Sequence, residues 1–125
     1  MIRKESEKTL EARLVREIEA RGGMALKYTS QFHRGIPDRI CLFPCGILTF
    51  VEMKSTGKKP TKLQEHAMRK LSSMGFDCLV IDSTQKLDEY LANVDATIEM
   101  LPQLEEKRAQ MLTQMGLICP ELRSL

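Results

Sequence analysis

The stretch RGIPDRICLFPCGILTFVEMK, residues 34–54, places two carboxylates and a lysine inside an otherwise apolar run. Residues 39–43 and 47–53 are both typical of β-strands, and Pro44-Cys45-Gly46 separates them. This spacing predicts a β-hairpin, with Gly46 free to take a positive φ in the turn. The charged side chains therefore enter a hairpin that would otherwise be almost wholly apolar.

The register of this hairpin follows from its turn. If the turn is centred on Cys45, Asp38 lies directly opposite Glu52. The face with the two acids then pairs Ile40 with Phe50 and Leu42 with Leu48, and the other face pairs Arg39 with Val51, Cys41 with Thr49 and Phe43 with Ile47. A slip of one residue would move every side chain to the wrong face, so the agreement supports the register.

The opposed acids Asp38 and Glu52 need an explanation. Opposed Cβ atoms lie about 4.5 to 5.5 Å apart. Two carboxylates at that distance, beside an apolar surface, repel each other and lose hydration, so one takes up a proton or a cation lies between them. A hard divalent ion, Mg²⁺ or Mn²⁺, resolves the conflict most simply. Lys54 points to the same face, within reach of a metal-bound water or a phosphate.

Other polar residues have two interpretations each. Glu11 borders the apolar face of a helix predicted at residues 5–21, and either contacts the metal, directly or through water, or is a solvated carboxylate. Gln64 either orients Lys54 or a phosphate, or only borders the apolar face of its helix. Gly35 permits a tight bend and Pro37 favours an extended conformation of Ile36, so Asp38 is expected to enter the sheet at a fixed place. The loop before it contains His33 and Arg34.

The remaining chain suggests an α/β domain. Predicted elements follow in the order α-β-β-β-α-β-α around a small mixed sheet: a helix at residues 5–21, a strand at 24–28, the hairpin, a helix at 61–74, a strand at 78–81 and a helix at 84–91. The predicted apolar face of the helix at 61–74 consists of Leu63, Ala67, Leu71 and Met74. Residues 1–96 form this core. Residues 97–125 are expected to be a helical extension, interrupted by Pro102, that packs on the core or contacts another subunit.

Composition narrows the class of protein. The chain has 125 residues, 42% of them hydrophobic and 29% charged, as in one soluble domain. Neither a membrane span nor a signal peptide is evident, and no Cys-x-x-Cys pair occurs, so a cytoplasmic location with reduced thiols is expected. The net charge is only +2. Residues 54–70 nevertheless hold six basic side chains against Glu65 alone, which is either a solvated face or a phosphate-binding surface.

One ordered set of residues resembles a known family. Glu11, Gly35-Ile36-Pro37-Asp38, Glu52-Met53-Lys54 and Gln64 occur in the order seen in the VRR-NUC (virus-type replication–repair nuclease) family of the PD-(D/E)XK superfamily. The similarity covers residues 5 to 92. It implies a restriction-endonuclease-like core with a central sheet between helices, and an enzyme that hydrolyses DNA with Mg²⁺ or Mn²⁺.

The resemblance also implies a role for each residue of the set. Asp38, Glu52 and the Met53 carbonyl would hold the metal, Lys54 would position the attacking water, Glu11 would bind a metal-linked water or a second ion, and Gln64 would support the site. Standalone relatives look like homodimers that cut branched or structured DNA such as four-way junctions.

The side chains expected to contact DNA are His33, Arg34, Lys58, Lys59 and Lys62. Two rival interpretations remain. The first is a catalytically silent DNA-binding or assembly module with the same fold. The second is a small cytosolic interaction protein whose acids are ordinary surface charges. The placement of the acids inside an apolar hairpin disfavours the second rival.

Overall fold

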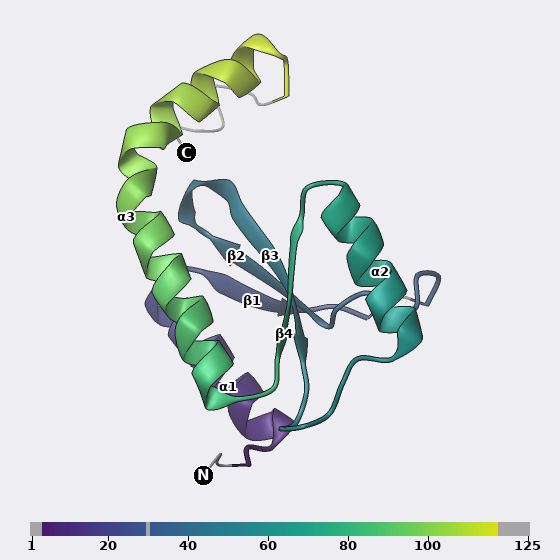
Figure 1. Ribbon diagram of the computed structural model, residues 1–125. Helices are drawn as coiled ribbons and strands as arrows, with labels where there is room; N and C mark the ends of the chain where they lie inside the picture. Colours follow the sequence, from purple (N-terminus) through teal and green to yellow (C-terminus); the bar gives the residue numbers. More distant parts are fainter. Residues whose placement is uncertain (1–3, 30, 118–125) are drawn as a thin grey trace. The chain divides into compact units, whose positions relative to one another are not determined.

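A computed structural model describes residues 4–29 and 31–117 of the chain, and its centre is a mixed four-stranded sheet flanked by helices (Figure 1). The elements are α1 (Glu7–Ala20), β1 (Met24–Lys27), β2 (Arg39–Phe43), the 3₁₀ turn η1 (Pro44–Gly46), β3 (Ile47–Met53), α2 (Lys62–Ser73), β4 (Asp77–Ile81) and α3 (Thr84–Gln114). The strand order is β1-β2-β3-β4. Both the α/β class and the predicted order of elements are confirmed.

The central hairpin has the predicted register. Strand β2 is antiparallel to β3, with Arg39 opposite Val51, Cys41 opposite Thr49 and Phe43 opposite Ile47. Gly46 closes the turn with a φ of 75°. Strand β4 joins β3 in parallel, because α2 provides the crossover that a parallel pair requires. Asp38 itself precedes the first residue of β2, so it enters at the mouth of the hairpin.

The two faces of the sheet differ in burial. The core lies on the face of Cys41, Val51 and Met53, which are 0% exposed. Three leucine and isoleucine side chains of α1 and three residues at the start of α3 are buried with it: Leu10, Leu14, Ile18, Leu87, Tyr90 and Leu91. The opposite face carries Glu52, and its apolar residues Ile40 and Phe50 are half-buried. The charged site therefore lies on the less covered face of the sheet.

Helix α2 covers this second face incompletely. Of the apolar residues predicted on one face of this helix, only Ala67 is buried, while Leu63 is 50% and Met74 58% exposed. The burial is limited because α2 packs mainly beside β4, the last strand of the sheet. A helix at a sheet edge buries a narrower stripe than one that crosses the centre.

The C-terminal helix also differs from the prediction. A helix at 84–91 and a separate, proline-interrupted segment were expected, whereas α3 is continuous and contains Pro102. Residues 92–114 contain no glycine, so good helix formers continue on both sides of the proline. The chain forms two compact units, Met1–Leu91 and Ala92–Leu125. In the part of the chain described here, no helix combines the length and apolarity that crossing a bilayer demands.

Candidate active site

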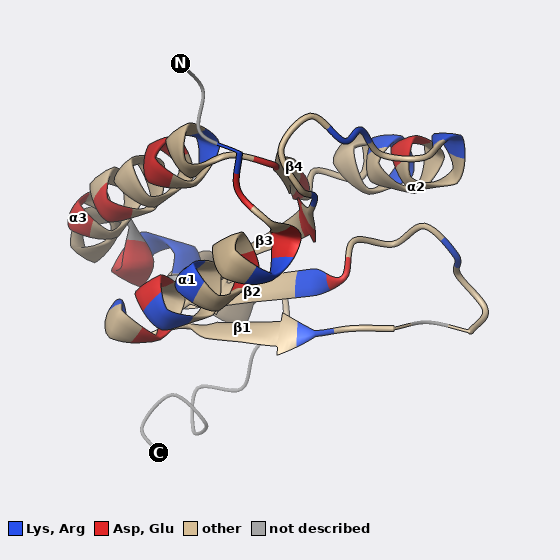
Figure 2. Cartoon of the chain, turned by 90° about the horizontal axis from the view of Figure 1, so that it is seen from below, with Lys and Arg blue, Asp and Glu red and all other residues tan. Residues whose placement is uncertain are grey.

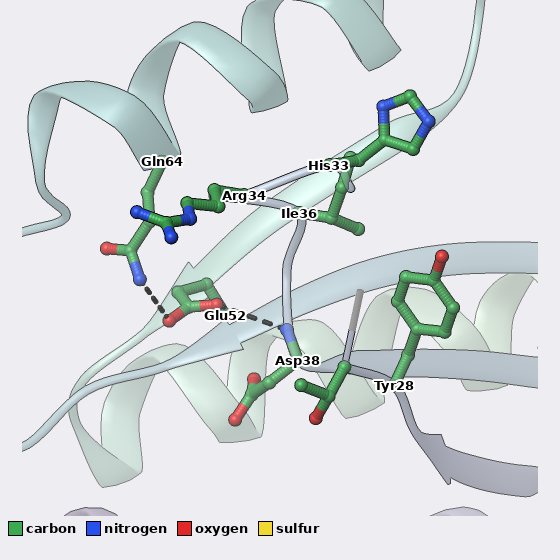
Figure 3. A pocket seen from close by; sticks show the side chains of 9 residues that line it. Tyr28, His33, Arg34, Ile36, Asp38, Glu52 and Gln64 are labelled. Carbon is green, nitrogen blue, oxygen red and sulfur yellow. Dashed lines mark hydrogen bonds between the residues drawn. The ribbon is translucent and has the colours of Figure 1, made fainter. Parts of the chain in front are cut away.

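Three of the five predicted catalytic residues, Asp38, Glu52 and Gln64, line one cavity of about 280 Å³ beside the hairpin (Figure 3). Asp38 comes from the mouth of the hairpin, Glu52 from the end of β3 and Gln64 from the first turn of α2. The segment between β1 and β2 forms the remaining wall. The lining residues are Tyr28, Thr29, His33, Arg34, Gly35, Ile36, Asp38, Glu52 and Gln64.

The segment before Asp38 is held in place by the backbone. Gly35 has a φ of 87°, and a Cβ at this position would lie 2.5 Å from the Leu63 carbonyl oxygen. Pro37 is fully buried. The Tyr28 amide donates a hydrogen bond of 2.8 Å to the Asp38 carbonyl. Because only glycine allows this close approach to α2, the Gly-Ile-Pro sequence fixes where Asp38 enters the site.

Glu52 is the centre of the contacts in the site. Its side chain is buried, and its Oε2 accepts a hydrogen bond of 3.2 Å from the Asp38 backbone amide. The other oxygen, Oε1, accepts a hydrogen bond of 2.8 Å from the Gln64 Nε2 and lies 3.6 Å from the Lys54 Nζ. The tertiary structure thus brings four of the predicted site residues together around one carboxylate.

The electrostatics of the two acids are those of a site that favours a cation. Burial raises the pKa of Asp38, and the negative charge of Glu11 raises it further. Burial likewise raises the pKa of Glu52, with the charge of Asp38 as the second cause. The Asp38 Oδ1 is buried and has no hydrogen-bond partner among the described residues. A buried carboxylate oxygen without a partner needs either a proton or a metal ion.

The donor set fits a hard divalent cation such as Mg²⁺. No group of three or more His, Cys, Asp or Glu side chains within residues 4–29 and 31–117 is arranged to hold a metal. Magnesium does not require such a cage, because it usually keeps several waters and binds through one or two carboxylates. Asp38 and Glu52 supply that pair. The proposed ligation by the Met53 carbonyl stays a prediction.

Glu11 has a partner that the sequence analysis did not assign. Its Oε1 accepts hydrogen bonds from the Arg39 Nε at 2.8 Å and lies 2.7 Å from the Arg39 Nη2. Arg39 also donates from Nη1 to the Ala25 carbonyl at 3.1 Å. Glu11 is therefore neither a solvated carboxylate nor part of the cavity lining. The sequence contained a signal for this pair. Strand alternation places Arg39 on the face of the sheet that α1 covers, and a guanidinium shielded from water there needs a carboxylate partner.

The predicted DNA-contacting residues divide into two groups. His33 and Arg34 line the cavity. Lys58, Lys59 and Lys62 are exposed and lie outside the lining, on the loop before α2 and at its start. The sequence analysis missed Tyr28 and Thr29 as part of the wall, since nothing in their spacing distinguishes them from other residues of a loop.

Comparisons with known proteins agree with this geometry. No protein-family model matches the chain. Over 91 residues it is 42% identical to "Putative nuclease p44" of Acyrthosiphon pisum secondary endosymbiont phage 1, an alignment that covers 71% of this chain and 95% of the relative. A solved structure described as "VRR_NUC domain" matches with a TM-score of 0.66 and 23% identity, covering 70% of this chain and 97% of that one.

The fold and the site together define a nuclease core of the PD-(D/E)XK type, in which an acid before one strand meets an acid and a lysine at the end of the next. The chain belongs to the VRR-NUC family of this class.

Proposed function

We propose that the protein is a metal-dependent deoxyribonuclease that hydrolyses phosphodiester bonds, with a preference for branched or structured DNA. The observation that carries this proposal is the combination of the unpartnered Asp38 Oδ1 with the Lys54–Glu52 contact. The "Putative nuclease p44" relative adds support through its name. A buried carboxylate oxygen without a partner is unfavourable for folding, so a function is the simplest reason to keep it.

The side chains have separate tasks in this mechanism. Asp38, Glu52 and the Met53 carbonyl would hold Mg²⁺ or Mn²⁺, which when bound supplies an acidified water and Lewis-acid stabilisation of the phosphate. Lys54 holds its ammonium 3.6 Å from the Glu52 Oε1, where it orients the nucleophile and offsets negative charge on the phosphate. Gln64 keeps the Glu52 carboxylate in one orientation through its hydrogen bond.

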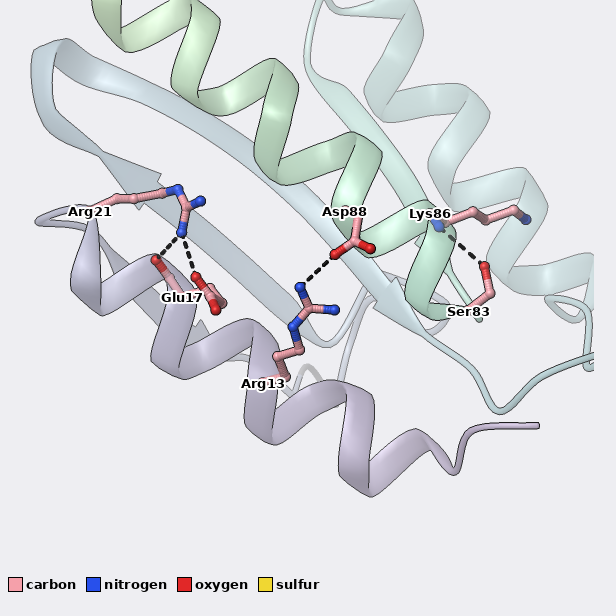
Figure 4. A network of polar contacts seen from close by, with 6 residues as sticks. All are labelled: Arg13, Glu17, Arg21, Ser83, Lys86 and Asp88. Carbon is pink, nitrogen blue, oxygen red and sulfur yellow. Dashed lines mark hydrogen bonds and ion pairs between the residues drawn. The ribbon is translucent and has the colours of Figure 1, made fainter. Parts of the chain in front are cut away.

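The distribution of ion pairs favours DNA binding beside α2. On the other side of the sheet, several cations are paired with acids, among them Arg13 with Asp88 and Arg21 with Glu17 (Figure 4). The basic side chains of the segment around α2 are exposed and form no ion pair with the described residues: Lys58, Lys59, Lys62, Arg69 and Lys70. Figure 2 shows Lys and Arg positions on α2 and on the loop that precedes it. Such cations are suited to phosphate contacts.

We also propose that two copies associate, as the family resemblance implies. Strand β1 lies at an edge of the sheet and exposes apolar side chains, with Met24 56% and Leu26 40% exposed. An open edge with apolar side chains favours pairing with another chain. Light scattering after size-exclusion chromatography should give twice the monomer mass. A cytoplasmic location, where the free thiols of Cys41 and Cys78 stay reduced, completes the proposal.

Cleavage assays test the enzymatic proposal. Plasmid, four-way junction, flap, splayed and linear DNA are incubated with Mg²⁺, with Mn²⁺ and with EDTA. We expect cleavage with either metal and none with EDTA, and we expect Lys54→Ala to lower the rate by roughly 100-fold or more. Lys8→Ala removes an exposed lysine of α1 and is the matched control. If Lys54→Ala and Asp38→Asn both cut like the parent, the mechanism is wrong.

The same assays distinguish the rival module. A protein that binds DNA with steep salt dependence and cuts no substrate under any condition would be a binding or assembly module with the nuclease fold. The Glu52 contacts with Lys54 and Gln64 favour the enzyme, because a binding module does not need a buried carboxylate at that position.

A further inference from the structure

The loop between β3 and α2 carries three of the lysines that the proposed function uses. Lys54 directly follows the last residue of β3, and Lys58 and Lys59 come before α2 begins. Neither a strand nor a helix fixes the backbone of this loop, although a displacement of about 1 Å from a productive position can cost about 100-fold in rate. Contacts from outside the loop therefore decide where these lysines lie.

The backbone of Glu5 supplies such a contact to Thr56, 51 residues further along the chain. The Glu5 amide donates a hydrogen bond of 2.8 Å to the Thr56 hydroxyl, and the Glu5 carbonyl accepts one of 3.1 Å from the Thr56 amide. The Thr56 hydroxyl donates to the same carbonyl at 3.3 Å. Figure 1 shows the loop after β3 passing beside the start of α1. Thr56 thus satisfies both backbone polar groups of Glu5.

The residues that follow Glu5 are held firmly at the start of α1. The Ser6 hydroxyl accepts a hydrogen bond of 3.1 Å from the Thr9 amide, and the Ser6 carbonyl accepts one of 3.1 Å from the Leu10 amide. Leu10 is 2% exposed and belongs to the core. A first turn that is capped and packed in this way has little freedom to move. The contact with Thr56 therefore ties the loop to α1 and to the core.

Thr56 lies midway between two of the lysines, two residues after Lys54 and two before Lys58. The Lys54 amide donates a hydrogen bond of 3.0 Å to the Ile81 carbonyl at the end of β4. The Lys58 amide donates one of 3.0 Å to the Ser55 carbonyl and closes a turn. Because Thr56 belongs to this turn, its contact with the segment before α1 fixes the backbone on both sides.

We propose that Thr56 is a positioning residue, which holds the Lys54 ammonium at the Glu52 carboxylate and keeps the lysines after it beside the DNA backbone. This inference rests on the proposed nuclease function and deepens it. Thr56 lies outside the cavity lining, so it acts through these lysines and not on the substrate. Without the hydroxyl, the loop keeps only its backbone hydrogen bond to Glu5, and the lysines lose their defined positions while the fold remains.

Two variants at this position test the role of the hydroxyl in the full-length protein. Thr56→Val removes the hydroxyl and retains the shape of the side chain, whereas Thr56→Ser retains the hydroxyl. Thr56→Val should lower the single-turnover cleavage rate in Mg²⁺ by about tenfold, as expected for one lost hydrogen bond. It should also weaken duplex binding, measured by fluorescence anisotropy in EDTA, by about threefold. Thr56→Ser should restore both values.

Variants of the lysines show whether Thr56 acts through them. In a Lys54→Ala background, addition of Thr56→Val should lower the residual cleavage rate no further, because the misplaced group is already absent. In a Lys58→Ala, Lys59→Ala background, its effect on DNA binding should disappear in the same way. Additive losses in both backgrounds would overturn the inference.

Thr97→Val is the matched control, because the Thr97 hydroxyl donates a hydrogen bond of 2.7 Å to the Asn93 carbonyl within α3. It should cut and bind DNA like the parent, and losses equal to those of Thr56→Val would overturn the inference. A parent that cuts no DNA, but binds it more weakly with Thr56→Val, would refute the nuclease proposal and retain the positioning of the DNA-binding lysines. A parent that cuts while Thr56→Val cuts and binds equally well would refute the positioning role alone.

Discussion

Gln64 joins the start of α2 to Glu52 through a hydrogen bond of 2.8 Å from its Nε2 to the carboxylate Oε1. The other end of the same amide, Oε1, accepts a hydrogen bond of 2.9 Å from the Thr61 backbone amide, and the Thr61 hydroxyl accepts one of 3.2 Å from the Gln64 amide in return. Gln64 is therefore both a member of the capping box of α2, with Thr61 as the N-cap, and a partner of the site carboxylate. A change at Gln64 acts on the helix and on the site together.

Two substitutions at Gln64 separate these roles. Glutamate retains the capping geometry but places a second negative charge against Glu52, whereas alanine removes both the cap and the hydrogen bond. We expect Gln64→Ala to lower the free energy of unfolding by about 1 kcal/mol. Gln64→Glu should lose cleavage and keep the helix. Urea unfolding, helical circular dichroism and cleavage rates measure the three effects. Full cleavage by Gln64→Glu would show that the amide is not needed by the site.

The metal-free protein should become more stable when Asp38 loses its charge. Because burial raises the pKa of Asp38 in the folded state, the folded protein binds more protons than the unfolded chain as the pH falls. The contribution of Asp38 to the stability of the parent therefore decreases as the pH rises above the ordinary carboxyl range, about pH 4. In EDTA, Asp38→Asn should melt higher than the parent at neutral pH, and the gap should narrow near pH 4.

Metal should reverse this order. Mg²⁺ binding stabilises only a folded state that holds its ligands, so it should raise the Tm of the parent and not that of Asp38→Asn. Thermal unfolding followed by circular dichroism, with and without the ion, gives all four values. A lower Tm for Asp38→Asn at neutral pH in EDTA would contradict the electrostatic account of the site.

Arg39 and Glu11 should be strongly coupled. Their side chains are 14% and 18% exposed, so Arg39→Ala leaves a largely buried carboxylate without its partner. Loss of one member of such a pair costs about 3 kcal/mol in unfolding free energy. The Arg39→Ala, Glu11→Gln double-mutant cycle should give a coupling energy of about 1 to 3 kcal/mol. Lys86 and Asp82 form the control pair, because Lys86 is 52% exposed and its loss should cost less than about 1 kcal/mol.

Two glycines provide a matched test of the loop geometry. Gly35 and Gly57 have nearly equal φ angles of 87° and 85°, but a Cβ at Gly35 meets the Leu63 carbonyl while one at Gly57 meets nothing within 4 Å. Gly57→Ala should cost about 1 kcal/mol from the positive φ alone. Gly35→Ala should cost at least about 1 kcal/mol more, because the segment must move away from α2. Equal losses in denaturant unfolding would show that the close approach to α2 is unimportant.

Local rules were sufficient for the hairpin. The three-residue turn and the two-residue period of a strand predict a register in which Asp38 lies near Glu52. The structure has that register. The start of α2 was also predictable, since Thr61 with Gln64 three residues later is a capping box. The prediction of an interrupted C-terminal helix was wrong. The cost of one proline in a helix, about 3 kcal/mol, is small beside the summed contribution of many favourable helical residues.

The sequence by itself determined the pairing of β2 with β3, the α/β order of elements and the meeting of Asp38 with Glu52, because these depend mainly on local patterns along the chain. Only the tertiary structure decided the partners of the charges. Glu11 and Arg39 are 28 residues apart, so no turn and no helix or strand period links them. Their pairing requires α1 to pack on the sheet, because only then does the Glu11 carboxylate lie beside the Arg39 guanidinium.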